Sequence, residues 1–122
     1  MDNYFFDSYA IIKTIEEDKN YILYREKKII TSSLNLMEVY YYLLRKFNKQ
    51  TAEYWMKNLD VELVNVIRLD LAIEAAYFKF EHKNKKLSYV DCLGYILARR
   101  WKIKFLTGDK EFEGKENVEF VK

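Results

Sequence analysis

The chain alternates short apolar runs with longer stretches of helical periodicity, and this alternation limits its fold more than any other feature. Strands are expected at the apolar runs, which are residues 3–6, 29–31, 62–66, 103–106 and 118–121. Helices are expected over residues 8–17, 20–26, 34–47, 50–59, 69–82 and 88–101. Alternating strands and helices are typical of an α/β fold, in which helices cover both faces of a parallel sheet.

Two acidic residues follow predicted strands. Asp7 comes directly after the first strand, and Asp109 follows the fourth within Thr107-Gly108-Asp109. Ligands of open parallel sheets bind outside the carboxyl ends of the strands, so both acids are candidate site residues. We expect them at the ends of neighbouring strands. Two simpler interpretations stay open, because Asp7 could cap the next helix and Asp109 could be a turn residue.

Two further acids lie on predicted helices. Asp91 has Gly94, Tyr95 and Ala98 on its side of the helix, a largely apolar stripe on which an ionised carboxylate is costly unless it is paired or binds metal. Glu38 lies on a mixed face and could be an ordinary surface residue. Together the four acids offer the hard oxygen ligands that Mg²⁺ and Mn²⁺ prefer. Two such ions about 3.5–4 Å apart can activate a water against a phosphodiester.

Length and composition limit the kinds of protein and of site that this chain can form. The 122 residues have the length of one domain, taken as 1–122, and a net charge of +2 neither requires nor excludes a nucleic-acid partner. A single cysteine and a single histidine exclude a zinc site of the usual type. We expect Cys92 to be a buried thiol and His82 a solvated loop or helix-end residue. With no signal-peptide pattern and no apolar run near the ~20 residues of a membrane span, a cytoplasmic protein without membrane contact is expected.

Five short motifs follow one another along the chain. They are FFDS at residues 5–8, SSLNLMEV at 32–39, LSYVDCL at 87–93, FLTGDKEF at 105–112 and VEFV at 118–121. In this order they resemble the PIN-domain family, and in particular the VapC-type toxins of prokaryotic toxin–antitoxin pairs. The resemblance implies a five-stranded parallel sheet flanked by helices, endoribonuclease activity that depends on Mg²⁺ or Mn²⁺, a homodimer and a cognate antitoxin.

The resemblance also implies which residues form the site. The family's catalytic, metal-binding acids match Asp7, Glu38, Asp91 and Asp109. Supporting hydroxyl groups match at Ser8 and Thr107. Tyr9 departs from the pattern, since many members have a second small hydroxyl residue there, and Glu111 stands where some members carry one more acid.

The RNA contacts, the aromatic-rich helices and the function each have more than one interpretation. Lys110, Lys86 and Arg99 are candidate contacts for RNA phosphates, with solvated helix ends as the alternative. The aromatic-rich helices around Tyr40 and Trp55 could stack on RNA bases, form a subunit interface or pack in the core. The leading function is a metal-dependent ribonuclease that acts as the toxin of a toxin–antitoxin pair. The alternatives are a housekeeping RNA-processing nuclease and a non-catalytic RNA- or protein-binding module.

Overall fold

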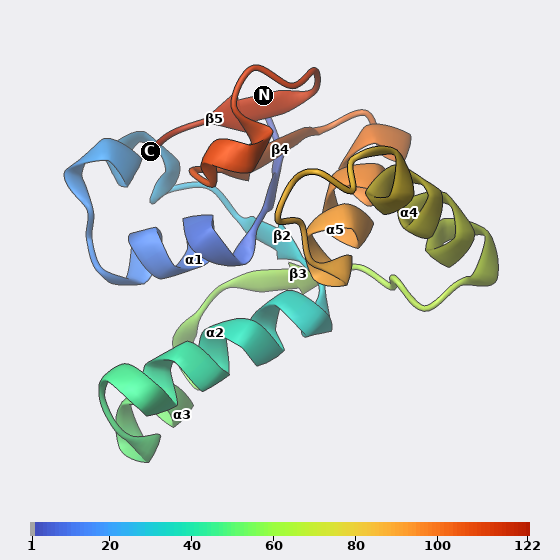
Figure 1. Ribbon diagram of the computed structural model, residues 1–122. Coiled ribbons are helices and arrows are strands. Elements are labelled where there is room, and N and C mark those ends of the chain that lie inside the picture. The colour runs from blue at the N-terminus through green and yellow to red at the C-terminus, as the bar shows by residue number, and fades with distance from the viewer. Residues whose placement is uncertain (1) are drawn as a thin grey trace.

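The computed structural model describes residues 2–122 and shows a parallel sheet covered by helices on both faces (Figure 1). Its strands are β1 (Tyr4–Phe6), β2 (Ile29–Thr31), β3 (Val61–Leu63), β4 (Lys104–Thr107) and β5 (Val118–Phe120), in the order β3-β2-β1-β4-β5. Its helices are α1 (Ser8–Ile15), α2 (Ser33–Lys46), α3 (Lys49–Asn58), α4 (Leu69–Glu81) and α5 (Tyr89–Arg100), with the 3₁₀ helices η1 (Lys19–Tyr24) and η2 (Lys110–Phe112). The α/β fold with a five-stranded parallel sheet is confirmed. Within the described residues, no helix has the length and apolar character needed to cross a bilayer.

The central strand β1 lies between β2 and β4, and its pairing fixes the place of the first acid. Phe6 is in register with Leu106, and the N–H of Asp7 donates to the carbonyl oxygen of Leu106 at 3.0 Å. Strand β4 ends at Thr107, so Asp109 comes two residues after the end of the neighbouring strand. The prediction that Asp7 and Asp109 follow the carboxyl ends of adjacent strands is therefore confirmed.

Side-chain caps explain where the helices begin. The carboxylate of Asp7 accepts from the N–H of Ser8 at the start of α1, and Ser32 caps α2. Ser88 and Asp91 form a reciprocal capping box at the start of α5. Such caps satisfy N–H groups that the first helical turn leaves without an intrahelical partner. The capping interpretation of Asp7 is thus correct, and it places this acid at a strand–helix junction.

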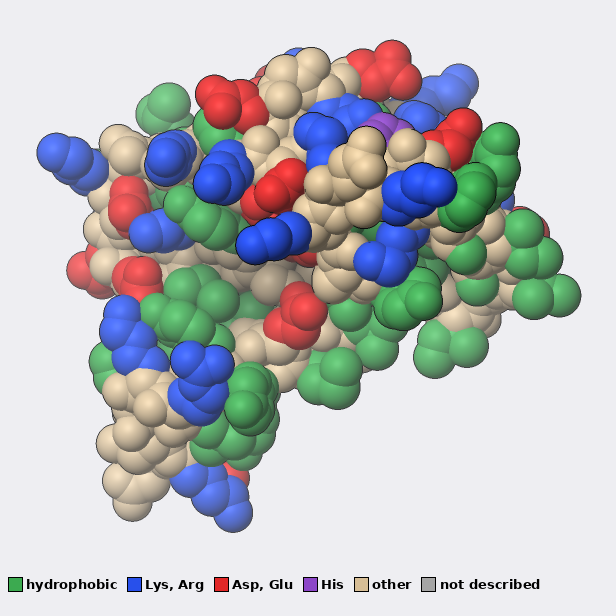
Figure 2. Space-filling view, in the orientation of Figure 1, with side chains coloured by type: hydrophobic (Ala, Val, Ile, Leu, Met, Phe, Trp, Pro, Cys, Tyr) green, Lys and Arg blue, Asp and Glu red, His purple; other side chains and the backbone are tan. Residues whose placement is uncertain are grey.

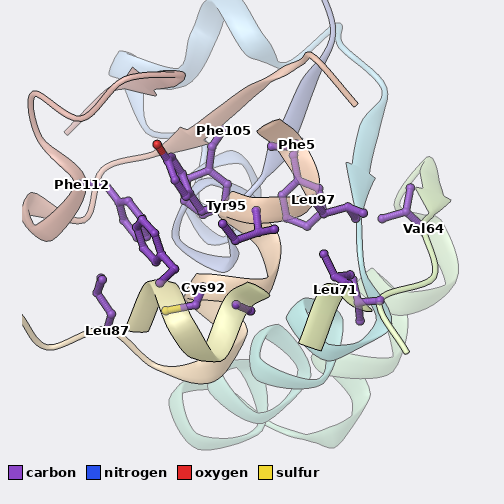
Figure 3. Close-up of a cluster of buried hydrophobic side chains, with 14 of the residues drawn as sticks. Phe5, Val64, Leu71, Leu87, Cys92, Tyr95, Leu97, Phe105 and Phe112 are labelled. Carbon is purple, nitrogen blue, oxygen red and sulfur yellow. The ribbon is translucent and has the colours of Figure 1, made fainter. Parts of the chain in front are cut away.

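Each face of the sheet has its own hydrophobic core, because side chains alternate along β1. Phe5 points to the face covered by α4 and α5, where its cluster includes Tyr95, Phe105 and Phe112 (Figure 3). Cys92 is fully buried in the same cluster, and burial raises its thiol pKa to about 11, which confirms the expected buried thiol. On the other face the core contains Tyr4, Phe6, Ala10, Ile11, Tyr21, Val39, Leu43 and Leu106.

Helix α5 approaches the sheet closely at Gly94, one turn after Asp91. A Cβ atom on Gly94 would lie 2.8 Å from Cε1 of Phe5 and 3.0 Å from Cε1 of Phe105. Both rings belong to sheet strands, so the missing side chain lets the helix backbone lie directly on β1 and β4. This contact sets the depth at which the first turn of α5 meets the carboxyl end of the sheet.

The edge strand is shorter than expected. The sequence predicted a strand over residues 62–66, whereas β3 ends at Leu63 and its side chains are exposed or half-buried. The apolar signal came from Val64 and Val66, which are 6% and 4% exposed and pack in the core beyond the strand. The N–H of Val64 still donates to the carbonyl oxygen of Thr31, at 2.8 Å.

Two short helices and the histidine also differ from expectation. Residues 20–26 were predicted as a helix, and most of them form η1, a 3₁₀ helix capped by Asp18. Helix η2 was not predicted; it begins where the carboxylate of Asp109 accepts from the N–H of Glu111 at 3.0 Å. His82 ends α4, as expected, but its side chain is half-buried and hydrogen-bonded and is therefore less solvated than expected.

Candidate metal centre

The carboxylate of Asp7 occupies the buried centre of the candidate site. Asp7 is 3% exposed; its Oδ1 accepts from the N–H of Ser8 at 2.8 Å and its Oδ2 from the hydroxyl of Thr107 at 2.7 Å. Burial, and after it the negative charges of Asp91 and Glu38, raise the pKa of Asp7 to about 8, although these hydrogen bonds act in the opposite direction. Because both donors are neutral, a bound cation would supply the positive charge that favours the ionised form.

Glu38 is oriented by a buried polar network between α1 and α2. The hydroxyl of Ser8 donates to Oε1 of Glu38 at 2.6 Å, and Nδ2 of Asn35 donates to that hydroxyl at 3.0 Å. Asn35 is 1% exposed, and its Oδ1 accepts from the hydroxyl of Ser32 at 2.6 Å. Asn35 was not among the predicted site residues. Its place one turn before Glu38, on the same side of the helix, was the available signal.

Asp91 caps a helix and lies within the electrostatic influence of the other acids. Its Oδ2 accepts from the N–H of Ser88 at 2.8 Å, which leaves Oδ1 as the candidate ligand atom. Burial raises the pKa of Asp91, and the charges of Asp109 and Glu38 add to that increase. Burial of this carboxylate is therefore costly when it is ionised, as predicted, although the hydrogen bonds of the helix cap offset part of that cost.

Asp109 is tied to Asp7 through one hydroxyl group. The N–H of Asp109 donates to Oγ1 of Thr107 at 3.1 Å, and the same hydroxyl donates to Asp7. The adjoining helix η2 is held from the side by Lys85, whose Nζ donates to the carbonyl oxygen of Glu111 at 3.0 Å. The turn interpretation of Asp109 is correct, and the turn lies beside the buried carboxylate.

The four acids influence one another, but they are not drawn together around one point. Within residues 2–122, no three His, Cys, Asp or Glu side chains have the arrangement needed to hold a metal ion. Instead each carboxylate accepts hydrogen bonds from the chain around it. The donor set still fits a divalent metal, since it consists of hard carboxylate oxygens, and the charges of neighbouring acids help to raise the pKa of Asp7 and of Asp91.

The candidate RNA contacts lie in different surroundings. Lys110 and Lys86 are exposed, the first directly after the last acid and the second in the loop before α5. Arg99 lies in the last turn of α5, where carboxylate oxygens of Glu74 and Glu116 are 3.3 Å and 3.9 Å from its guanidinium nitrogens. In the orientation of Figure 1, Lys and Arg side chains gather over the upper half of the molecular surface, with acidic side chains between them (Figure 2).

A family model of the PIN domain matches residues 4–117. The chain therefore belongs to the PIN-domain family. No curated protein sequence gives a significant match.

Solved structures share the fold over nearly the whole chain. The toxin VapC20 of Mycobacterium tuberculosis, described as cleaving the sarcin–ricin loop, is 19% identical with a TM-score of 0.76 and covers 98% of this chain and 100% of its own. VapBC2 of Rickettsia felis, bound to a fragment of promoter DNA, is 15% identical with a TM-score of 0.70 and covers 98% of each chain. A toxin–antitoxin complex from Klebsiella pneumoniae is 18% identical with a TM-score of 0.69 and covers 97% of this chain and 96% of the other.

Proposed function

We propose that this chain is a metal-dependent endoribonuclease and the toxin of a toxin–antitoxin pair. The observation that carries the proposal is the buried carboxylate of Asp7, whose pKa is raised by burial and by the charges of Asp91 and Glu38. Acids that raise the pKa of a buried carboxylate in this way are typical of functional sites, where a cation can neutralise them. Membership of the PIN-domain family and the fold shared with VapC20, a toxin that cleaves the sarcin–ricin loop, support RNA as the substrate.

The proposed ligands of Mg²⁺ or Mn²⁺ are Asp7, Glu38, Asp91 and Asp109. When bound, such an ion polarises a phosphodiester and lowers the pKa of a coordinated water. Thr107 and Ser8 orient the carboxylates of Asp7 and Glu38 through the hydrogen bonds described above. Lys110 and Lys86 would attract the phosphate backbone. Arg99 would do so only after its ion pairs with Glu74 and Glu116 break.

The test is cleavage of a mixed pool of single-stranded RNA by the purified chain, with single-stranded DNA of the same sequences as the control polymer. We expect RNA fragments with Mn²⁺ or Mg²⁺, none after addition of a chelator, and little cleavage of DNA. Intact RNA with either metal, under conditions in which the chain is folded, would contradict the proposal.

The toxin assignment makes a separate prediction about partners. The Klebsiella pneumoniae and Rickettsia felis neighbours are toxin–antitoxin complexes, and we propose a cognate antitoxin for this chain in the cytoplasm. Expression of the chain should then arrest growth, and co-expression of the small protein encoded beside it should restore growth. A housekeeping RNA-processing nuclease would cleave RNA without that arrest.

We also propose a homodimer, formed through α4 and not through the helices around Tyr40 and Trp55. Tyr40 and Trp55 are half-buried and pack against the core, whereas Tyr41 and Tyr54 on the same helices are exposed. The outward face of α4 is instead apolar and exposed along its whole length: Leu69, Ala72, Ile73, Ala76, Tyr77 and Phe80. Figure 2 shows hydrophobic side chains gathered over α4, on the right of the view. A helix that is apolar on both sides is typical of a buried helix.

A second copy of the chain is the occupant that this face favours. Large side chains alternate there with alanines, so two copies of α4 can interdigitate about a twofold axis. The bordering acids Asp70 and Glu74 are paired with Arg100 at 2.9 Å and 2.6 Å, which removes like-charge repulsion between the copies. Ile73→Glu should shift sedimentation at micromolar concentration from dimer to monomer, whereas Leu23→Glu on exposed η1 should not. A wild-type monomer would contradict the dimer.

A further inference from the structure

The single histidine faces a lysine from a distant part of the chain. Nε2 of His82 and Nζ of Lys115 lie 2.7 Å apart, and Nδ1 of His82 lies 2.8 Å from the carbonyl oxygen of Phe78. A carbonyl oxygen can only accept, so Nδ1 carries the ring proton and Nε2 is the acceptor for Lys115. The ring also stacks on Phe78, with the centroids 4.1 Å apart, which fixes its plane.

The pair borders an open cavity of about 630 Å³ between α4, α5 and residues 114–116. Tyr77 and Tyr95 contribute to its walls, and Gly114 leaves one side without a side chain. Glu74 also lines the cavity, and its carboxylate is paired with Arg100. In Figure 2 the histidine is the purple side chain near the top, with Lys and Arg side chains beside it. In the single chain, a small molecule can therefore reach Lys115 from solvent.

Charged groups act on Lys115 from each neighbouring element. Burial is the main cause that lowers its pKa; Lys85, in the loop after α4, and Arg99 of α5 lower it further. Glu116 beside it and Glu81 at the end of α4 act in the opposite direction. The pKa of Lys115 is lowered overall, so more of this amine is neutral and nucleophilic than in an exposed lysine at the same pH.

We propose that Lys115 is an acylation site at which His82 acts as the general base, and that the acyl donor is a small acyl phosphate. The ammonium of Lys115 first gives one proton to Nε2 of His82, which passes it to solvent. The neutral Nζ then bonds to the acyl carbon as the bond between that carbon and the phosphate oxygen breaks. The second proton leaves with the phosphate, and the product is an uncharged amide.

The modification would change the segment that begins at Asp109. Residues 110–116 are fastened to the end of α4 by the hydrogen bond of Lys115 to His82, and by the bond that Lys85 makes to this segment. Nζ of Lys115 also lies 5.3 Å from the centre of the Phe78 ring, a cation–π contact that an amide cannot make. Acylation would therefore loosen the attachment of this segment. The inference does not depend on ribonuclease activity.

The experiment treats the folded protein with acetyl phosphate and measures acetylation at each lysine by peptide mass spectrometry, at low overall extent. Lys57, which is exposed on α3, is the internal reference. We expect Lys115 to react ~10-fold faster than Lys57, as a neighbouring base allows. In His82→Gln, which keeps a hydrogen-bond acceptor but has no basic nitrogen, the rate at Lys115 should fall to that of Lys57.

Two results would overturn the proposal. One is a wild-type rate at Lys115 no higher than that at Lys57, which needs no variant and so does not depend on the folding of His82→Gln. The other is an unchanged rate at Lys115 in His82→Gln whose circular dichroism matches that of the wild type, because the base would then have no role. Lys115→Arg should remove the fast-reacting site and leave the rate at Lys57 unchanged; a fast phase that persists would place the reactive amine elsewhere.

Discussion

The hydroxyl of Thr107 donates to Oδ2 of Asp7 at 2.7 Å, across 100 positions of the sequence. Both residues are buried, and the same hydroxyl accepts the N–H of Asp109. One neutral side chain thus connects the first and last acids of the candidate site. The parallel pairing of β1 with β4 makes this contact possible, because it brings the ends of the two strands to the same edge of the sheet.

Thr107→Val should weaken both the fold and the site. The variant keeps the shape of the side chain but leaves Oδ2 of Asp7 without its donor, a loss of ~1–3 kcal/mol in the free energy of unfolding. Mn²⁺ affinity should fall by ~10-fold or more, because the hydrogen bond orients a proposed ligand. Urea unfolding and calorimetric Mn²⁺ titration measure the two effects. Thr14→Val on α1 is the matched control, and equal Mn²⁺ affinity in the two variants would refute the role of Thr107.

The stability of the metal-free protein should depend on pH through Asp7. Its pKa is about 8 in the folded chain, against 3.8 for an aspartate side chain in water. Between these values the unfolded chain releases a proton that the folded chain retains, so stability falls as pH rises from about 4 to about 8. Asp7→Asn should remove this loss. The measurement is urea unfolding in chelator at several pH values, and parallel pH profiles for the two proteins would show that Asp7 is not responsible.

Metal binding should release protons near neutral pH. Asp7 is protonated below about pH 8 in the metal-free chain, and a carboxylate must be ionised to bind Mn²⁺. Calorimetric titration at pH 7 in two buffers with different ionisation enthalpies should therefore give different binding enthalpies. Asp7→Asn should show a smaller difference between the buffers. The same enthalpy for the wild type in both buffers would mean that no proton is released.

Gly94→Ala should destabilise the protein although alanine is the better helix former. Helix propensity alone would favour alanine by ~1 kcal/mol. The new Cβ would lie 2.8 Å from a carbon of the Phe5 ring, and overpacking of this kind costs ~1–3 kcal/mol. Comparison of Glu53→Ala with Glu53→Gly, at an exposed position in the middle of α3, calibrates the propensity difference in the same protein. Urea unfolding checks the sign, and a more stable Gly94→Ala would mean that α5 moves away from the sheet without cost.

The sequence was informative where a local pattern and the sheet geometry agree. Asp7 and Asp109 could be placed together because each follows an apolar run, and parallel strands bring their carboxyl ends to one edge. Asp91 could be placed in the first turn of a helix because helical periodicity begins at residue 88. In each case the position of the acid followed from its place directly beside the end of a predicted strand or the start of a predicted helix.

Contacts that depend on packing between distant segments could not be predicted in the same way. The hydrogen bond between His82 and Lys115 joins segments 33 residues apart and follows no local pattern. The exposure of the outward face of α4 could not be predicted for another reason. Its helix is apolar on both sides, so periodicity did not show that Ile73 and Tyr77 would be exposed while Leu71 would be buried.

The central claim is that these acids support metal-dependent cleavage of RNA, and Asp91→Asn tests it most directly. The substitution removes one ligand charge but keeps an oxygen that can accept from the N–H of Ser88, so the helix cap and the fold should survive. Asp60→Asn, an identical change at an exposed position, is the control. With Mn²⁺ and a mixed RNA pool, we predict that Asp91→Asn loses cleavage, by ~100-fold or more, while Asp60→Asn cleaves like the wild type. Cleavage by Asp91→Asn at the wild-type rate would contradict the account.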